Sequence, residues 1–418
     1  MMKNVNKKRV KVNKIYIILG AIYLVAFVFR IFIAGTILGH HTDMGCFSYW
    51  GEQAYQDGLL EFYNGKLYCD YPPLYIYILW VIEALRELFG IMFAFPAHII
   101  MLKLPSIIFD LISAYFIYKI AKNRFSEKTS VILSALMAFN IAYILNSSAW
   151  GQIDSILTFL IILTAYNIMN NKLQWATVAY VFAVLLKPQA FIFAPILIFA
   201  YIKSRNLKKV ITSLLIGLGV FIAVILPFAL RQHPLWIFGL YFGTMGQYAY
   251  ATVNAYNLYA LLGTNWVPDS EILFLLPYKI YGYIAIVGVC ALTATAFVKG
   301  HKKPGFTFAT AGLLMTVVFT FATKMHERYI FPSILLVLAA YIFSNDRRFM
   351  HIHILQTLTF FANCTYILHL NYTNSYDIYS PFIAIVSAIS VFTALWYIKI
   401  YIQLYIMNKD NMPSKYLT

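Results

Sequence analysis

The chain has 418 residues, of which 61% are hydrophobic and 11% are charged, and its mean hydropathy is +0.71. This composition excludes a soluble globular protein, and repeated apolar runs of about 20 residues predict a polytopic α-helical membrane protein. A transmembrane β-barrel would instead show short segments of alternating polarity. The net charge of +16 would indicate a nucleic-acid partner only if the basic residues shared a soluble surface; in a membrane protein it typically reflects cytoplasmic loops. We therefore expect no nucleic-acid partner.

The first 14 residues are basic and lead directly into an apolar run. A signal peptide would have a shorter apolar region followed by a cleavage site with small residues. We therefore expect this segment to be the cytoplasmic lead into an uncleaved first span.

Twelve apolar runs predict the membrane spans. They lie at residues 15–38, 98–120, 130–147, 154–170, 174–186, 189–202, 210–230, 277–298, 305–323, 329–344, 350–369 and 381–402. The segment 74–93 is also long and apolar, but Glu83, Arg86 and Glu87 interrupt it.

Charge decides how the segment 74–93 is treated. With this segment outside the membrane core, 23 of the 32 Lys and Arg residues lie in cytoplasmic segments. Counting it as a span would invert every later loop, against the positive-inside bias. We predict an all-α polytopic membrane protein, a bundle of about 12 transmembrane helices in a single domain, 1–418, with both termini cytoplasmic. The first outer loop, 39–97, would end in an amphipathic helix at the interface.

Acidic residues concentrate on the predicted outer side, which holds twelve of the sixteen. Five of them lie in the stretch 40–73 at the start of the first outer loop, namely Asp43, Glu52, Asp57, Glu61 and Asp70. Acidic residues contribute little to orientation, so the rule that set the topology did not impose this asymmetry. It indicates that carboxylate chemistry takes place on the outer face.

The cysteines are less informative. Cys290 and Cys364 fall in apolar runs and are simplest as small core residues. Cys46 and Cys69 share the first outer loop and could form a disulfide in an oxidising compartment. The sequence alone leaves that open, because it does not supply the Cα separation.

Six polar clusters interrupt or end apolar runs at the outer face. Charges at such positions are costly unless they are paired or hydrated. The clusters are His40–Asp43, Asp70–Leu74, Trp150–Ser155, Lys187–Ala190, Tyr256–Tyr259 and Lys324–Tyr329. Any one of them could be an interface anchor, but six on one side predict a common site.

These clusters resemble a known family. An aspartate soon after the first span, followed by DYPPL (70–74), WGQIDS (150–155), KPQ (187–189) and MHERYIFP (325–332), is similar to the GT-C superfamily of integral-membrane glycosyltransferases. The pattern most resembles bacterial mannosyltransferase-like proteins related to the enzyme that adds the second mannose of GPI anchors. DYPPL is also similar to glucosyltransferases of the N-glycan pathway that use a dolichyl-phosphate sugar. The resemblance covers residues from about 40 to 335, although KPQ alone is weakly specific.

The resemblance implies a lipid-phosphate-linked sugar donor, inverting transfer and an active site above the membrane, beneath the first outer loop. In such enzymes an aspartate of this loop is the catalytic base, and Asp43 holds the matching place. The chemistry agrees, since a carboxylate must take the proton of the acceptor hydroxyl and cations must stabilise the departing phosphate. Arg328, Lys187 and His326 could do the latter, with Arg the better bidentate partner. The alternative for Asp43 is a loop-structuring carboxylate.

The remaining polar residues of the clusters are predicted substrate contacts. The complete predicted binding set is Asp70, Tyr71, Trp150, Gln152, Asp154, Lys187, Gln189, Tyr256, Asn257, His326, Glu327 and Arg328.

Structural alternatives remain open for several of these residues. Asp70 could cap the helix that Pro72 begins, and Asp154 could be an N-terminal cap beside Trp150 as an interfacial aromatic. Glu327 could simply pair with a neighbouring cation.

A metal site is conceivable because His40 and His41 stand beside Asp43. The outer loops lack an Asp-x-Asp pair, so we predict no metal and no other cofactor. Within the spans, Arg30 and Asp110 are expected to pair structurally.

We thus expect an inverting transferase that moves a hexose, mannose or similar, from a polyprenyl-phosphate donor in the lipid bilayer. The acceptor would be a glycan, glycolipid or polymer on the outer face of a bacterial plasma membrane. One alternative, a transporter or flippase of lipid-linked glycans, predicts ionisable residues at mid-span and two related halves. Another is a polysaccharide polymerase with similar chemistry. Here the charges gather on one face and no related halves are evident.

Overall fold

The computed structural model describes residues 2–65 and 68–407 of this chain, which form a helical bundle. The helices in chain order are α1 (Met2–Thr36), α2 (His41–Gln56), α3 (Pro73–Leu88), α4 (Ala97–Ala121), α5 (Glu127–Ala138), α6 (Ile141–Ile144), the π-helix η1 (Leu145–Trp150), α7 (Asp154–Met169), α8 (Leu173–Leu186), the 3₁₀-helix η2 (Pro188–Phe193), α9 (Ala194–Ser204), α10 (Leu207–Ala229), α11 (Trp236–Gly246), α12 (Leu258–Leu261), α13 (Tyr278–Gly300), α14 (Phe306–Phe321), α15 (Phe331–Ser344), α16 (Arg347–Thr373) and α17 (Pro381–Tyr405). One short hairpin, β1 (Ile272–Leu273) with β2 (Leu276–Pro277), is antiparallel.

The predicted spans coincide with these helices, two of which are broken. The predicted span 130–147 corresponds to α5, α6 and η1 together, and 189–202 corresponds to η2 and α9. Within the described ranges, six helical segments are long and apolar enough to cross a membrane, and five shorter apolar helices accompany them. Their lipid-compatible surfaces are evident in α10, where Leu214, Leu215 and Leu218 are exposed. The polytopic all-α membrane fold is confirmed.

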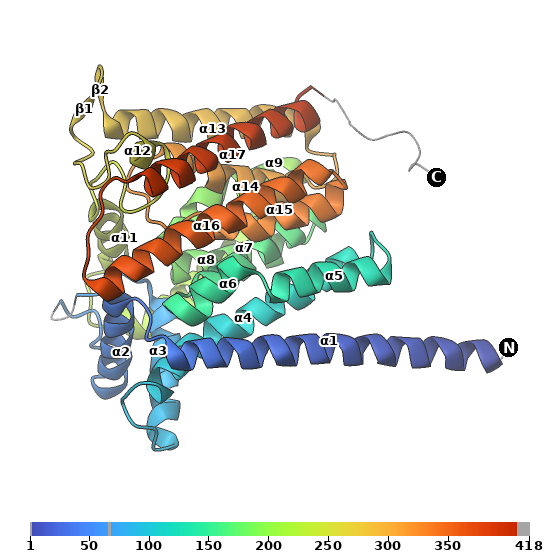
Figure 1. The fold of residues 1–418 in the computed structure, drawn as a ribbon, viewed down its shortest axis with the longest axis horizontal. Coiled ribbons are helices and arrows are strands. Elements are labelled where there is room, and N and C mark those ends of the chain that lie inside the picture. The colour runs from blue at the N-terminus through green and yellow to red at the C-terminus, as the bar shows by residue number, and fades with distance from the viewer. Residues whose placement is uncertain (1, 66–67, 408–418) are drawn as a thin grey trace.

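The long helices run side by side, whereas α2 and α3 lie across one end of the bundle (Figure 1). Helix α1 begins at the opposite end, and α17 also finishes there (Figure 1). This arrangement agrees with the prediction that both termini lie on one side of the membrane and the first outer loop on the other. Which side faces the cytoplasm remains a prediction.

The first outer loop is more regular than expected. The predicted helix in its second half is present as α3, but the first half, expected to be a loop, forms α2. Helix α2 buries Met44, Phe47 and Trp50, which recur at the spacing of one helix face. Gly51 faces α3, where a Cβ would lie 3.0 Å from Glu83 Cγ, so the absence of a side chain lets the two helices approach closely. The two helices therefore form one layer over the bundle.

A buried ion pair joins the helices beneath this layer. Arg30 Nε lies 3.0 Å from Asp110 Oδ2, and both side chains are fully buried, as predicted. Ser147 and Ser155 donate to the same carboxylate at 2.7 and 2.5 Å, and Arg30 also donates to Ala138 O. Buried charges are tolerated when they are paired and hydrogen-bonded in this way. The network fixes η1 and the start of α7 against α1 and α4.

All four cysteines are free, so Cys46 and Cys69 form no disulfide. Cys69 instead donates a long hydrogen bond from its Sγ to Tyr71 O at 3.7 Å.

The placement of the α3–α4 turn can be tested by labelling. We expect Met92→Cys to react with a membrane-impermeant maleimide in intact cells, because Met92 is 77% exposed in this turn. Asn123→Cys, exposed after α4 at the other end, should react only after permeabilisation. Both substitutions are made with Cys46 and Cys69 replaced by serine, and that parent is the control. Reaction of both positions from the same side would show that the twelve-span topology is wrong.

Candidate active site

The site begins where the chain leaves α1 and docks on the end of η1. Gly39 has φ +110°, and a Cβ there would lie 2.5 Å from Trp150 O. Only glycine adopts this conformation without strain and allows so close an approach. The next residue, His40, donates its backbone N–H to Trp150 O at 3.2 Å, and its ring stacks on the indole with centroids 5.0 Å apart. Helix α2 therefore starts against Trp150, with Asp43 in its first turn.

Three groups converge on Asp43 Oδ2. Trp150 Nε1 donates to this oxygen at 2.7 Å, Arg328 Nη1 donates at 3.3 Å, and His40 Nδ1 lies 3.6 Å away. Burial by itself raises the pKa of Asp43, but the positive charge of Arg328 and the indole hydrogen bond outweigh it and hold the pKa at about 2. The carboxylate is therefore ionised at neutral pH. Its side chain is still one-fifth exposed, so an incoming hydroxyl can reach it.

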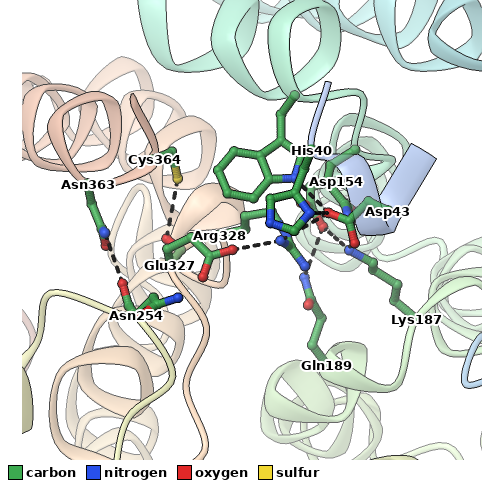
Figure 2. A network of polar contacts seen from close by, with 12 residues as sticks. His40, Asp43, Asp154, Lys187, Gln189, Asn254, Glu327, Arg328, Asn363 and Cys364 are labelled. Atoms are coloured by element: carbon green, nitrogen blue, oxygen red, sulfur yellow. Dashed lines mark hydrogen bonds and ion pairs between the residues drawn. The ribbon is translucent and has the colours of Figure 1, made fainter. Parts of the chain in front are cut away.

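Arg328 is held from two sides. Its Nη1 also donates to Glu327 Oε1 at 2.6 Å, and its guanidinium carbon lies 5.1 Å from the centroid of the Trp150 ring. Its Nε is buried and has no hydrogen-bond partner among the described residues. A buried donor without a partner is costly, and a bound anion would satisfy it. Figure 2 shows Arg328 between Glu327 and the group formed by Asp43 and Asp154.

A second cation lies on the other side of the site. Lys187 follows the last residue of α8, and its Nζ donates to Asp154 Oδ1 at 2.6 Å and to Gln152 Oε1 at 3.1 Å. Tyr71 donates to the same Gln152 oxygen at 3.1 Å, and its ring centroid lies 5.4 Å from Lys187 Nζ. A cation at the C-terminal end of one helix and a carboxylate at the N-terminal end of another both match the helix dipoles. Gln189 makes a weaker contact with Asp154 at 3.5 Å.

The neighbouring titratable groups have shifted pKa values. Burial, together with the positive charge of Arg328, lowers the pKa of His326 to about 3, so this imidazole is neutral at physiological pH. Burial raises the pKa of Asp70 and of Glu327. Arg328 is thus the firmest cation of the site, whereas burial lowers the pKa of Lys187, whose ammonium pairs with Asp154. A phosphate contact by His326 stays a prediction, made by a neutral imidazole.

Backbone pairing holds the segment that carries Arg328. Val253 N donates to Met325 O at 2.9 Å, and Lys324 N donates to Tyr250 O at 3.0 Å. Asn363 of α16 in turn holds the segment that contains Val253, because Asn363 Nδ2 donates to Asn254 O at 2.9 Å (Figure 2). Sequence reasoning missed this bracing.

Lys103 is a second residue that sequence reasoning did not assign. It is fully buried, and its Nζ donates to Ile37 O at 2.6 Å, Ser148 O at 2.8 Å and Ala149 O at 3.2 Å. It therefore ties the end of α1 to the end of η1, directly beside Gly39 and Trp150. Buried lysines in spans usually mark a function, but no pattern of spacing indicated this one.

The predicted site residues divide into two groups. Eleven of the thirteen surround the Asp43–Arg328 contact or the Lys187–Asp154 contact: Asp43, Asp70, Tyr71, Trp150, Gln152, Asp154, Lys187, Gln189, His326, Glu327 and Arg328. Asn257 instead caps α12 and donates to Phe319 O at 3.1 Å. Tyr256 donates its backbone N–H to Asn363 Oδ1 at 3.0 Å, and its ring packs on Phe382. These two residues have structural contacts, and substrate binding by them stays a prediction.

The structure also excludes the two helix-capping alternatives that the sequence left open for Asp70 and Asp154. Asp70 does not cap α3, because the N-cap residue is Pro72 and no side chain makes the cap bond. Asp154 is the first residue of α7, again without a side-chain cap, and its carboxylate pairs with Lys187 instead.

A metal ion would need several ligands close together. Among the residues that the structure describes, no three His, Cys, Asp or Glu side chains are grouped to hold one. His41, which the sequence placed beside Asp43, packs its ring on Tyr372 at 5.0 Å. Metal independence stays a prediction.

Comparison with known proteins supports a glycosyltransferase resemblance. Residues 70–230 match the model of a family described as dolichyl-phosphate-mannose-protein mannosyltransferases. No curated protein gives a significant match. Among solved structures, the crystal structure of ArnT from Cupriavidus metallidurans bound to undecaprenyl phosphate is similar, at 13% identity over 95% of this chain and 81% of that chain, with a TM-score of 0.44. The family match confirms the resemblance over a segment that includes Lys187 and Asp154 but not Asp43 or Arg328.

The Lys187–Asp154 pair generates a stability prediction. Lys187→Met would leave Asp154 buried without its cation, and breaking one side of a buried pair typically costs about 3–5 kcal/mol. Replacing both residues, as Lys187→Met with Asp154→Leu, should cost less than the first substitution alone. Thermal unfolding of the purified protein in detergent measures both, with Lys172→Met at an exposed turn as the control. If the double variant loses as much free energy of unfolding as Lys187→Met and Asp154→Leu lose together when measured singly, the two groups are not coupled.

Proposed function

From the match of residues 70–230 to a glycosyltransferase family, we propose that this chain is an inverting hexosyltransferase. It would transfer a hexose, mannose or similar, from a polyprenyl-phosphate-linked donor to a glycan, glycolipid or polymer acceptor on the outer face of a bacterial plasma membrane. The observation that carries the proposal is the contact of Asp43 with Arg328, with Lys187 in the same buried site. The matching family is named for a dolichyl-phosphate sugar, which is a polyprenyl-phosphate donor.

The two cations suit a donor phosphate. Arg328 has an unsatisfied Nε and a planar guanidinium, and guanidinium binds phosphate oxygens in pairs. Lys187 adds a second positive charge at the end of α8. Such preorganised charge stabilises the phosphate that leaves with the electron pair of the broken glycosidic bond.

Donor binding would also prepare the base. While Arg328 contacts Asp43, the pKa of the carboxylate is about 2, which makes it a weak proton acceptor. A phosphate that draws Arg328 toward itself removes part of this stabilisation, and the pKa of Asp43 then rises. Asp43 accepts the proton of the acceptor hydroxyl while the oxygen of that hydroxyl bonds to the anomeric carbon. The bond from that carbon to the phosphate oxygen breaks, and the single displacement inverts the configuration.

The indole of Trp150 would orient this base. It is fully buried and donates to Asp43 Oδ2, so its N–H is already occupied. We assign it to positioning, because stacking on a sugar ring would require an exposed face. Gln152, Asp154 and Tyr71 remain predicted contacts for sugar hydroxyls, since Gln152 Nε2 and Asp154 Oδ2 lack partners among the described residues.

Substitution of Arg328 tests the phosphate contact. Arg328→Ala should weaken donor binding by about 10- to 100-fold, the range expected for hydrogen bonds to a charged group. Arg328→Lys should restore only part of it, because an ammonium cannot form two parallel bonds. Donor KM and turnover are measured on purified protein with a short-chain polyprenyl-phosphate sugar. If the lysine variant equals the unmodified enzyme, the bidentate contact is refuted.

Substitution of Asp43 tests the base. Asp43→Asn keeps the shape of the side chain but accepts no proton, so turnover should fall on the order of 10²–10⁴-fold. Donor affinity and melting temperature should change little. The matched control is Asp57→Asn, an exposed carboxylate that follows the last residue of the same helix.

A structural function of Asp43 predicts a different result. In that case the melting temperature or yield would fall and activity would follow the amount of folded protein. Full turnover by well-folded Asp43→Asn protein would end the assignment, and Asp70 or Asp154 would be tested next.

A further inference from the structure

A polar cavity of about 310 Å³ lies at the end of the bundle opposite the site. It is lined by the turn between α7 and α8 and by the turn between α9 and α10. Helix α7 leaves the site at Asp154 and runs for 16 residues, which is about 24 Å, before this turn. Helix α8 returns to the site at Lys187. The cavity is therefore separate from the candidate active site and lies where the spans reach the opposite membrane boundary.

The lining of this cavity is basic and offers hydrogen-bond donors. It includes Lys203, Lys209, Ser204, Asn171 and Asn206. No acidic residue occurs anywhere between residues 155 and 268, so the neighbouring sequence provides no counter-charge. Neither lysine forms an ion pair with a carboxylate in the part of the chain that the structure describes. A pocket that combines this positive charge with hydrogen-bond donors is suited to an anion.

The two lysines are differently placed. Lys209 donates from Nζ to Asn171 O at 2.7 Å, which directs its ammonium across the cavity from α10 to the α7–α8 turn. An ammonium has three donors, so two remain for a ligand. Lys203 is exposed in the last turn of α9 and has no hydrogen-bond partner among the described residues, so it can turn toward the same ligand.

We propose that this cavity binds the headgroup of an anionic phospholipid from the adjacent leaflet. Basic pockets between transmembrane helices near a membrane surface bind anionic headgroups in this way. The exposed apolar side chains Ile202, Leu207 and Ile211 flank the cavity and would accommodate the acyl chains. The lipid would bridge the two helical turns, and its phosphate would supply the counter-charge that the chain lacks here.

Thermal stability of the purified full-length protein tests the proposal. In detergent supplemented with phosphatidylglycerol, the melting temperature should rise more than with phosphatidylcholine of the same acyl chains. Lys203→Gln together with Lys209→Gln should weaken the apparent phosphatidylglycerol affinity about tenfold or more, from the contribution of each lysine near an anionic surface. Lys208→Gln, exposed in the same helical turn but outside the cavity lining, is the matched control.

The single variant Lys203→Gln separates lipid binding from folding, because Lys203 makes no hydrogen bond or ion pair within the described part of the protein. It should reduce the phosphatidylglycerol effect while leaving the lipid-free melting temperature unchanged. Equal stabilisation by the two lipids, or an equal loss in Lys208→Gln, would overturn the proposal. So would stabilisation by inorganic phosphate at the same concentration that depends on Lys203 and Lys209, since it would identify a free-anion site.

Discussion

The hydrogen bond from the Trp150 indole to Asp43 depends on a close contact between two distant parts of the chain. The carbonyl of Trp150 accepts from His40 N, and the absence of a side chain at Gly39 allows the approach. Lys103 holds the end of α1 and the end of η1 together from below, and the Arg30–Asp110 network holds η1 against its neighbours. These buried polar contacts thus help to place one carboxylate.

The two cations of the site are each paired with carboxylates, and the contact between Arg328 and Asp43 is the one that a bound phosphate could replace. Arg328 is shared between Asp43 and Glu327, while Lys187 is committed to Asp154. A phosphate that takes Arg328 would leave Asp43 less stabilised as an anion and more basic. Under the proposed function, the same contact that keeps the resting carboxylate ionised would therefore link the basicity of Asp43 to donor binding. This link would limit proton abstraction in the absence of the donor.

The spans could be predicted from the sequence because they depend on local apolar runs, and the positions of the twelve agree with the helices. The first outer loop was harder. Helix α2 contains two glycines and interleaved polar residues, and its apolar face is stable only against α3. The broken helix at η1 was not predicted either, since its π-turn ends in Gly151 at φ +95° and depends on the tertiary contacts around it.

The candidate site was partly predictable for a related reason. Asp43, Lys187 and Arg328 are far apart in the sequence, but the topology places them on one face, and the motif resemblance identified the same residues. Asn363 and Lys103 could not be found, because they donate to backbone carbonyls of segments that are remote in the sequence. The neutral state of His326 could not be predicted either, since its burial beside Arg328 is a property of the folded site.

The proposed transferase would cleave a polyprenyl-phosphate sugar at its anomeric carbon with inversion. The most direct measurement follows purified protein, a short-chain polyprenyl-phosphate hexose and a simple acceptor by NMR, recording the anomeric configuration of donor and product. For an inverting transferase, we expect release of polyprenyl phosphate together with a product of inverted anomeric configuration. Retention of configuration, or movement of the intact lipid-linked sugar across a vesicle membrane without release of polyprenyl phosphate, would contradict it.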